Sequence, residues 1–172
     1  DEMLNMGFRE DIEFILSHAT ARQAAWLFSA TMPKEVRRIA QTFMENPVEI
    51  KVNSIATAQN IKHVYYQCQS SQKYETLKRL IDFNPGMYGI VFTRTKLEAQ
   101  DITEKLLKEG YEIDALHGDL SQQQRDKVMG RFREKTIKLL IATDVAARGI
   151  DVNDITHVIN YALPDEPEVY TH

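Results

Sequence analysis

The chain has 172 residues, 43% of them hydrophobic, which is enough to form the core of one or two domains. Its formal net charge of −4 excludes a general basic field, so any nucleic-acid contact must be a local patch. The single cysteine, Cys68, excludes an internal disulfide and a cysteine-based zinc site, and no apolar run reaches the roughly 18 residues of a membrane span.

Helical and strand-like patterns alternate along the chain, which is typical of βαβ units around a parallel sheet. In the first third, helices are predicted at 8–16 and 34–44 and strands at 24–28 and 48–52. Residues 54–60 are small and polar and lack periodicity, so we interpret them as an interdomain linker. The linker separates a first domain, 1–53, from a second, 61–172.

The first domain supplies only about two strands and two helices, which are too few to close a core. We therefore expect Trp26, Leu27 and Phe28 to be partly exposed. We also expect this half to be aggregation-prone or disordered, unlike 61–172.

The second domain is predicted to contain five strands with helices between them. These strands are expected at 64–68, 88–93, 112–116, 138–142 and 157–161. The first one alternates, with Val64, Tyr66 and Cys68 on one face. By contrast, 138–142 is an apolar run after its first residue, Lys138, as expected of a buried strand. The fold class is therefore α/β, a parallel sheet flanked by helices.

Two helices of this domain are expected to begin at capping boxes, in which two residues satisfy each other's free backbone N–H groups. Thr95 with Glu98 marks the first helix, and Ser121 with Gln124 marks the second. The buried face of the first helix is expected to comprise Leu97, Ile102 and Leu106.

Segment 143–152 follows strand 138–142 directly and places Asp144, Arg148 and Asp151 at the carboxyl end of that strand. In open α/β sheets, ligands bind in the crevice beyond such strand ends, so we expect a phosphate or a ribose to bind here. Asp144 and Arg148 have an equally good alternative, an internal ion pair that shapes the loop.

Five short motifs resemble, in order and spacing, the later motifs of DEAD-box RNA helicases. They are 29–31 (Ser-Ala-Thr), 90–94, His117-Gly118, Gln122 with Arg125, and 143–152. Ser-Ala-Thr alone carries almost no weight, whereas five elements in register are specific, and they cover essentially the whole chain. The resemblance implies RecA-like domains that close over ATP and RNA, single-stranded or duplex.

The ends of the chain also resemble family motifs. Gly7-Phe8 places Asp1 as the last letter of the Asp-Glu-Ala-Asp motif, since Met3-Leu4 does not continue a motif opened by Asp1-Glu2. His172 resembles the first letter of the final arginine-rich motif. We therefore expect an internal fragment, with 1–53 the end of RecA-like domain 1 and 61–172 a truncated domain 2.

The resemblance also implies roles for single residues. Ser29 and Thr31 would couple to Asp1, although Thr31 has an alternative role as a helix N-cap. Asp151 would bond the ribose hydroxyls of ATP. The residues implied to contact the RNA backbone are Thr93, Arg94, Gly118, Arg125, Thr143 and Gly149. Such contacts position nucleic acid without reading its sequence.

ATP and Mg²⁺ are the implied cofactors, and both would be held mainly by residues upstream of Asp1. We therefore expect the isolated chain not to hydrolyse ATP. For Lys127, Arg131 and Arg133, near Arg125, we prefer a solvated helix face to an RNA contact. His117 has an alternative as a core or turn histidine, and the scattered histidines do not suggest a metal site.

Two other functions remain open from the sequence. One is a non-enzymatic module that docks RNA or a protein, and the other is a related DNA translocase. The combination of 29–31 with 147–151 favours the RNA family. We expect no membrane association. The single unpaired cysteine is consistent with a reducing compartment, and we expect a cytoplasmic protein.

Overall fold

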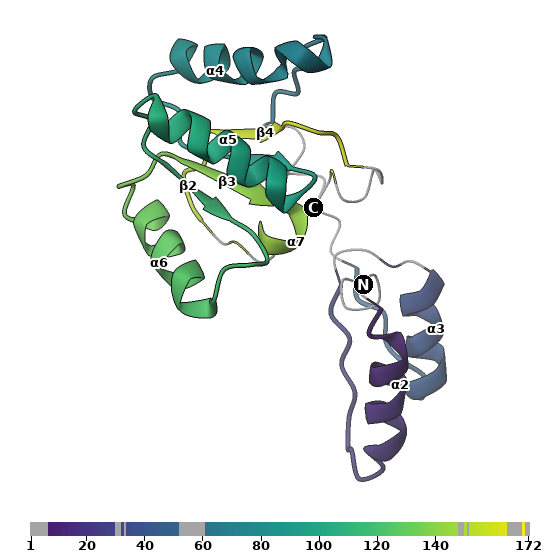
Figure 1. Cartoon of the computed structure of the whole chain (residues 1–172). Coiled ribbons are helices and arrows are strands. Elements are labelled where there is room, and N and C mark those ends of the chain that lie inside the picture. Colours follow the sequence, from purple (N-terminus) through teal and green to yellow (C-terminus); the bar gives the residue numbers. More distant parts are fainter. Residues whose placement is uncertain are drawn as a thin grey trace. The chain divides into compact units, whose positions relative to one another are not determined.

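The computed structural model describes residues 7–29, 32, 34–51, 61–147, 150, 152–164 and 170. Contacts divide the chain into two compact units, Asp1–His63 and Val64–His172, and each is described by itself (Figure 1). None of the described helices is long and apolar enough to cross a membrane.

The described part of the first unit contains two helices, α2 (Arg9–His18) and α3 (Lys34–Phe43). Both were predicted. Arg22 joins their ends, because its guanidinium donates to the carbonyl oxygens of Leu16 at 2.7 Å and Phe43 at 3.0 Å. Burial is limited: α3 buries Val36 and Ile39, whereas α2 buries no side chain.

The strands predicted at 24–28 and 48–52 are wrong for the residues described, which form no strand there. A strand is stable only when a neighbouring strand pairs its backbone N–H and C=O groups, and the described part of this unit offers none. Trp26 and Phe28 are 82% and 86% exposed, and Leu27 is 40% exposed, so the expected exposure of these three is confirmed. That this half is aggregation-prone or disordered, unlike 61–172, remains a prediction.

The second unit is a four-stranded parallel sheet in the order β2-β3-β1-β4. Its strands are β1 (Gly89–Thr93), β2 (Ile113–Leu116), β3 (Leu139–Thr143) and β4 (His157–Asn160). Its helices are η1 (Ser70–Gln72), α4 (Lys73–Phe83), α5 (Lys96–Lys108), α6 (Gln122–Arg133) and the short α7 (Asp144–Ala147). The predicted α/β class is confirmed, and these four strands lie within one residue of their predicted bounds.

Helices cover both faces of this sheet, with α4 and α5 on one face and α6 and α7 on the other (Figure 1). Side chains that alternate along β1 and β3 serve the two layers. The first layer includes Leu77, Ile81, Val91, Ile102, Leu106 and Ile141. The second includes Ile90, Val128, Phe132, Leu140 and Ala146. The two apolar strands β1 and β3 are therefore covered on both faces, as their continuous apolar sequences require.

Two details of the second unit differ from the predictions. Residues 61–69 form no strand, and Val64 and Tyr66 are each 58% exposed, because no described strand pairs with them. Leu97 is 70% exposed. Five residues separate it from Ile102, which places it on a different side of α5 from the buried positions.

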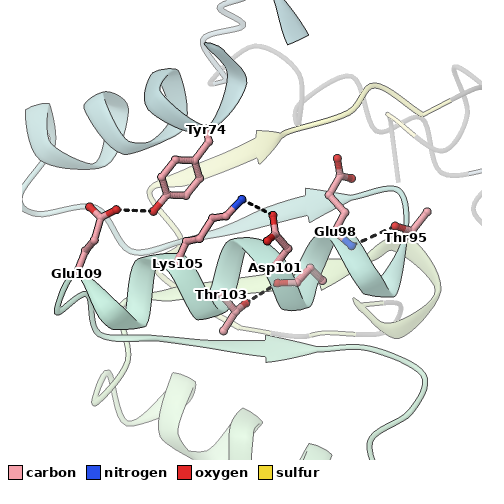
Figure 2. A network of polar contacts seen from close by, with 8 residues as sticks. Tyr74, Thr95, Glu98, Asp101, Thr103, Lys105 and Glu109 are labelled. Atoms are coloured by element: carbon pink, nitrogen blue, oxygen red, sulfur yellow. Dashed lines mark hydrogen bonds and ion pairs between the residues drawn. The ribbon is translucent and has the colours of Figure 1, made fainter. Parts of the chain in front are cut away.

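Polar contacts attach α4 to α5 and to the loop that follows it. The Tyr74 hydroxyl donates to Glu109 at 2.9 Å, and Lys78 pairs with the same carboxylate. Figure 2 shows Tyr74 pointing at Glu109 while Lys105 turns toward Asp101, 2.7 Å away.

Tyr111, just beyond the end of α5, makes a second attachment to α4. Its hydroxyl donates to Asp82 at 2.5 Å. This hydrogen bond is the main reason that the pKa of Tyr111 is raised to about 12, and burial adds to it.

Tyr111→Phe is expected to lower the free energy of unfolding by about 1 kcal/mol at neutral pH, because it removes this hydrogen bond. Since the pKa is raised in the folded state, the contribution is fully present below about pH 10, the ordinary tyrosine pKa. It should vanish as the pH rises to about 12. Urea titrations of both proteins across that range measure the difference.

Tyr65→Phe is the matched control, because Tyr65 is 89% exposed. A Tyr111→Phe effect that stayed constant up to pH 12 would contradict the assigned role of the hydrogen bond.

The two units should also differ in amide hydrogen exchange. Amides of α2 and α3 are expected to exchange faster than those of β1, β3 and α5, because the former helices bury few side chains. Mass spectrometry of peptic peptides measures this directly. Equal protection in both sets of elements would disprove the prediction.

Candidate functional site

Three strands end at one edge of the sheet, and three of the motifs found in the sequence lie there. In the parallel register, Thr93 of β1 lies opposite Thr143 of β3, and Leu116 of β2 lies opposite Ala142. Because His117 follows Leu116 directly, it reaches the same edge. Segments far apart in the sequence are therefore neighbours at the carboxyl ends of the strands, where α/β sheets bind ligands.

Thr93 is buried at this edge, with 2% of its surface exposed. Its hydroxyl lies 3.3 Å from the carbonyl oxygen of Ala142 and also 3.3 Å from that of Thr95, and it donates to both. The side chain thus links β1 to β3. A ligand at this point would meet the backbone around Thr93 and not its hydroxyl.

Arg94 turns away from β1 and joins two other segments. Its backbone N–H donates to Glu98 at 3.0 Å, and its guanidinium donates to the carbonyl oxygen of Leu163 at 3.2 Å. The capping box predicted for Thr95 and Glu98 is therefore only half formed. The Thr95 hydroxyl accepts from the N–H of Glu98 at 3.2 Å, but the Glu98 carboxylate reaches one residue further back.

The box predicted for Ser121 and Gln124 is complete. The N–H of Ser121 donates to the Gln124 side chain at 2.8 Å, and the N–H of Gln124 donates to the Ser121 hydroxyl at 3.3 Å. The start of α6, and with it Arg125, is therefore held in a defined place beside the site.

Gly118 lies in a turn that follows β2, closed by the N–H of Leu120 donating to the carbonyl oxygen of His117 at 3.2 Å. A Cβ added at Gly118 would meet no atom within 4 Å. At Gly89, by contrast, a Cβ would collide with the carbonyl oxygen of His157 in the neighbouring strand. The strand pairing requires Gly89, whereas no described neighbour requires a glycine at position 118.

His117 is 5% exposed, which agrees with its alternative as a core or turn histidine. Its Nε2 lies 3.3 Å from the side-chain nitrogen of Gln100. Its Nδ1 has no hydrogen-bond partner among the described residues. An unsatisfied buried polar atom costs about 1–3 kcal/mol. The unpaired Nδ1 therefore offsets part of the free energy that burial of this ring contributes to folding.

Arg125 connects α6 to α7. Its guanidinium donates to the carbonyl oxygen of Ala146 at 2.9 Å. A guanidinium has five N–H donors, so this bond leaves others for an anion. Arg131, further along α6, pairs with Asp114 at 2.6 Å instead, which supports its interpretation as part of a solvated face.

Thr143 ends β3 and Asp144 begins α7, and both are half-buried. Burial raises the pKa of the Asp144 carboxyl. The remaining residues of this loop that were singled out, Arg148, Gly149 and Asp151, lie outside the described residues. The ion pair suggested for Asp144 and Arg148 therefore stays a prediction.

Of the three residues expected to couple the motifs, the structure describes one. Ser29 is half-buried in the first unit, and Asp1 and Thr31 lie outside the described residues. Nor does the described part of the chain contain a group of three side chains that could hold a metal ion.

The chain matches a known family and known proteins. Residues 72–172 match the helicase conserved C-terminal domain. The whole chain is 47% identical to the DEAD-box ATP-dependent RNA helicase CshA of Geobacillus kaustophilus and covers 37% of it. It thus spans about a third of the length of the curated relatives it matches.

Solved structures agree with this similarity. A DEAD box protein from the hyperthermophile Methanococcus jannaschii matches all of this chain and 46% of its own, with a TM-score of 0.63 and 45% identity. Saccharomyces cerevisiae Dbp5 bound to RNA and ADP BeF3 matches 83% of this chain and 37% of its own, with a TM-score of 0.72 and 36% identity.

The two glycines described above should respond differently to substitution. Gly89→Ala is expected to destabilise the protein by about 1–3 kcal/mol, because the new methyl group would force β1 and β4 apart. Gly118→Ala is expected to change stability by less than about 0.5 kcal/mol. Urea denaturation measures both, and a large loss of stability in Gly118→Ala would show that the fold itself requires this glycine.

Proposed function

Because the chain belongs to the family of the helicase conserved C-terminal domain, and matches DEAD-box RNA helicases over its whole length, we propose that it is the RNA-holding part of an ATP-dependent RNA helicase. The whole protein would use ATP binding to close two RecA-like domains on a strand and open short duplexes locally. Hydrolysis would reset the open state. In this proposal 1–53 ends the first RecA-like domain, 54–60 is the linker, and 61–172 belongs to the second.

The observation that carries the proposal is the shared end of β2, β3 and β1. Neighbouring strands lie about 4.8 Å apart, so the ends of these three strands form a row. Along this row, Gly118 follows β2, Thr143 ends β3, and Arg94 follows β1. A single strand of RNA that crossed the row would meet these residues in that order.

Gly118 in this row and Arg125 near it suit a sugar–phosphate backbone. Gly118 has open space where a side chain would be, so a ligand can approach its backbone closely. Arg125 donates to the carbonyl oxygen of Ala146, three residues after Thr143, and brings a permanent positive charge. Such contacts position a nucleic acid without reading its bases, which suits an enzyme that acts on many RNAs.

We propose specific roles for four further residues of this chain. We propose that Asp151 bonds the ribose of ATP, that Gly149 faces RNA, and that Ser29 and Thr31 couple to Asp1.

The sequence contains no Gly-Lys-Ser or Gly-Lys-Thr phosphate-binding loop, and the described residues contain no group of three side chains that could hold a metal ion. We therefore assign Mg²⁺ to no described residue and propose that it is bound elsewhere in the whole protein. We also propose a cytoplasmic location.

Two alternatives make different predictions. A DNA translocase would bind single-stranded DNA as well as RNA, whereas an RNA enzyme would use the 2′-hydroxyl to prefer RNA. A non-enzymatic module would bind RNA, but the whole protein would not release phosphate from ATP in response to it.

Binding of single-stranded oligouridine to the chain tests the proposal. Arg125→Ala is expected to weaken binding about fivefold to tenfold and to lower the slope of log affinity against log salt by about 0.7, because one phosphate contact is lost. Fluorescence anisotropy at several salt concentrations measures both quantities.

Arg131→Ala is the matched control, since Arg131 lies on the same helix but pairs with Asp114. The same oligomer made of DNA should bind more weakly, and phosphate release from ATP should stay at the buffer blank. An Arg125→Ala variant with the affinity and salt slope of the wild type would contradict the proposed site.

A further inference from the structure

Two side chains of α5 flank the turn that contains Gly118. The Lys96 ammonium lies 2.9 Å from the Asp119 carboxylate, and the Gln100 amide nitrogen lies 3.3 Å from Nε2 of His117. Lys96 and Gln100 are four residues apart on a helix, so they project from the same face. Gly118 therefore lies between two residues that are each held by α5.

We propose that Lys96 and Gln100 are positioning residues, which hold the turn after β2 so that the backbone of Gly118 faces the nucleic acid. This inference rests on the RNA contact proposed above for Gly118 and adds the residues that orient it. Neither side chain need touch RNA or ATP in this arrangement.

A structural role alone accounts poorly for the pair of Lys96 and Asp119. Each side chain is 53% exposed, and ion pairs at such sites add little to stability. The neighbouring strand is already anchored by buried Ile113 and Leu116. The pair therefore has little to contribute to folding, whereas it does link the turn to α5.

A simple charge role does not account for it either. Asp119 places a negative charge directly beside a site proposed to bind a polyanion, which would repel the phosphates. An anion at this point is useful if it anchors the turn, and the ion pair of Asp119 with Lys96 links the turn to α5.

The contact of Gln100 with the buried His117 ring supports the same positioning role. The amide nitrogen of Gln100 lies 3.3 Å from Nε2 of His117, within hydrogen-bonding distance. Because Nδ1 has no partner among the described residues, Gln100 provides the hydrogen bond that orients this ring. Gly118 is the residue after His117, so a change in the orientation of the His117 ring would shift the backbone of the turn.

The decisive variant is Asp119→Asn, because the two explanations predict opposite signs. If charge alone matters, removing a carboxylate should tighten the binding of RNA. If Asp119 and Lys96 position the turn, binding should weaken, by about threefold given the modest strength of an exposed pair. The affinity of the full chain for a single-stranded oligouridine of about ten nucleotides, followed by the amide shifts of ¹⁵N-labelled protein, measures the change.

Three further variants separate positioning from general effects. Lys96→Met and Gln100→Leu should weaken binding, and Lys96→Arg should restore it. In the free protein, Lys96→Met should also speed hydrogen exchange at the Leu120 amide, which closes the turn. Lys105→Met is the control, because Lys105 pairs with Asp101 further along the same helix. Unfolding midpoints should stay unchanged in the Lys96 and Asp119 variants. Gln100→Leu is expected to lower the midpoint as well, because Nε2 of buried His117 loses its hydrogen bond.

The outcomes distinguish this inference from the function on which it rests. If the wild-type chain produces no amide shifts at Gly118 and Arg94 with oligouridine, both fail. If the wild type binds and Arg125→Ala weakens binding, but Asp119→Asn binds equally well or more tightly, the positioning role alone is wrong. Loss of binding in Lys96→Met without rescue by Lys96→Arg would likewise disprove it.

Discussion

The parallel register of three strands is the constraint on which the rest of the second unit depends. Thr93 lies opposite Thr143, and Leu116 lies opposite Ala142, so the carboxyl ends of β1, β2 and β3 coincide. This alignment makes neighbours of segments that are distant in the sequence. β4 joins the sheet on the other side of β1 because Gly89 has no side chain to collide with His157.

Helix α5 connects this sheet to nearly every other feature of the unit. Its inner face buries Ile102 and Leu106 against the strands, and its carboxyl end receives α4 through the contact of Tyr74 with Glu109 (Figure 2). Its first turns hold the loop after β2 through Lys96 and Gln100. A helix fixed so firmly by its apolar side is well suited to orient polar groups with its other side.

The second unit was predicted better than the first for a physical reason. Strands β1 to β4 are short apolar runs with helices between them, and that pattern is sufficient where each strand finds a partner. The apolar run at 24–28 and the alternating run at 64–68 also have strand patterns, but no described strand pairs with them. Periodicity says which side chains would be buried in a strand. It does not say whether a neighbouring strand is present.

What the sequence determined by itself was local: the longer helices but not η1 and α7, four of the strands, the caps at Ser121 and Thr95, and the order of motifs that indicates a helicase family. Only the tertiary structure decided that the Thr93 hydroxyl is buried and unavailable, that Glu98 reaches Arg94, and that Lys96 and Gln100 flank Gly118. Helix and cap preferences arise from interactions a few residues apart, which one stretch of sequence contains. Contacts between distant segments depend on strand register and helix packing, and these are settled only when the whole core assembles.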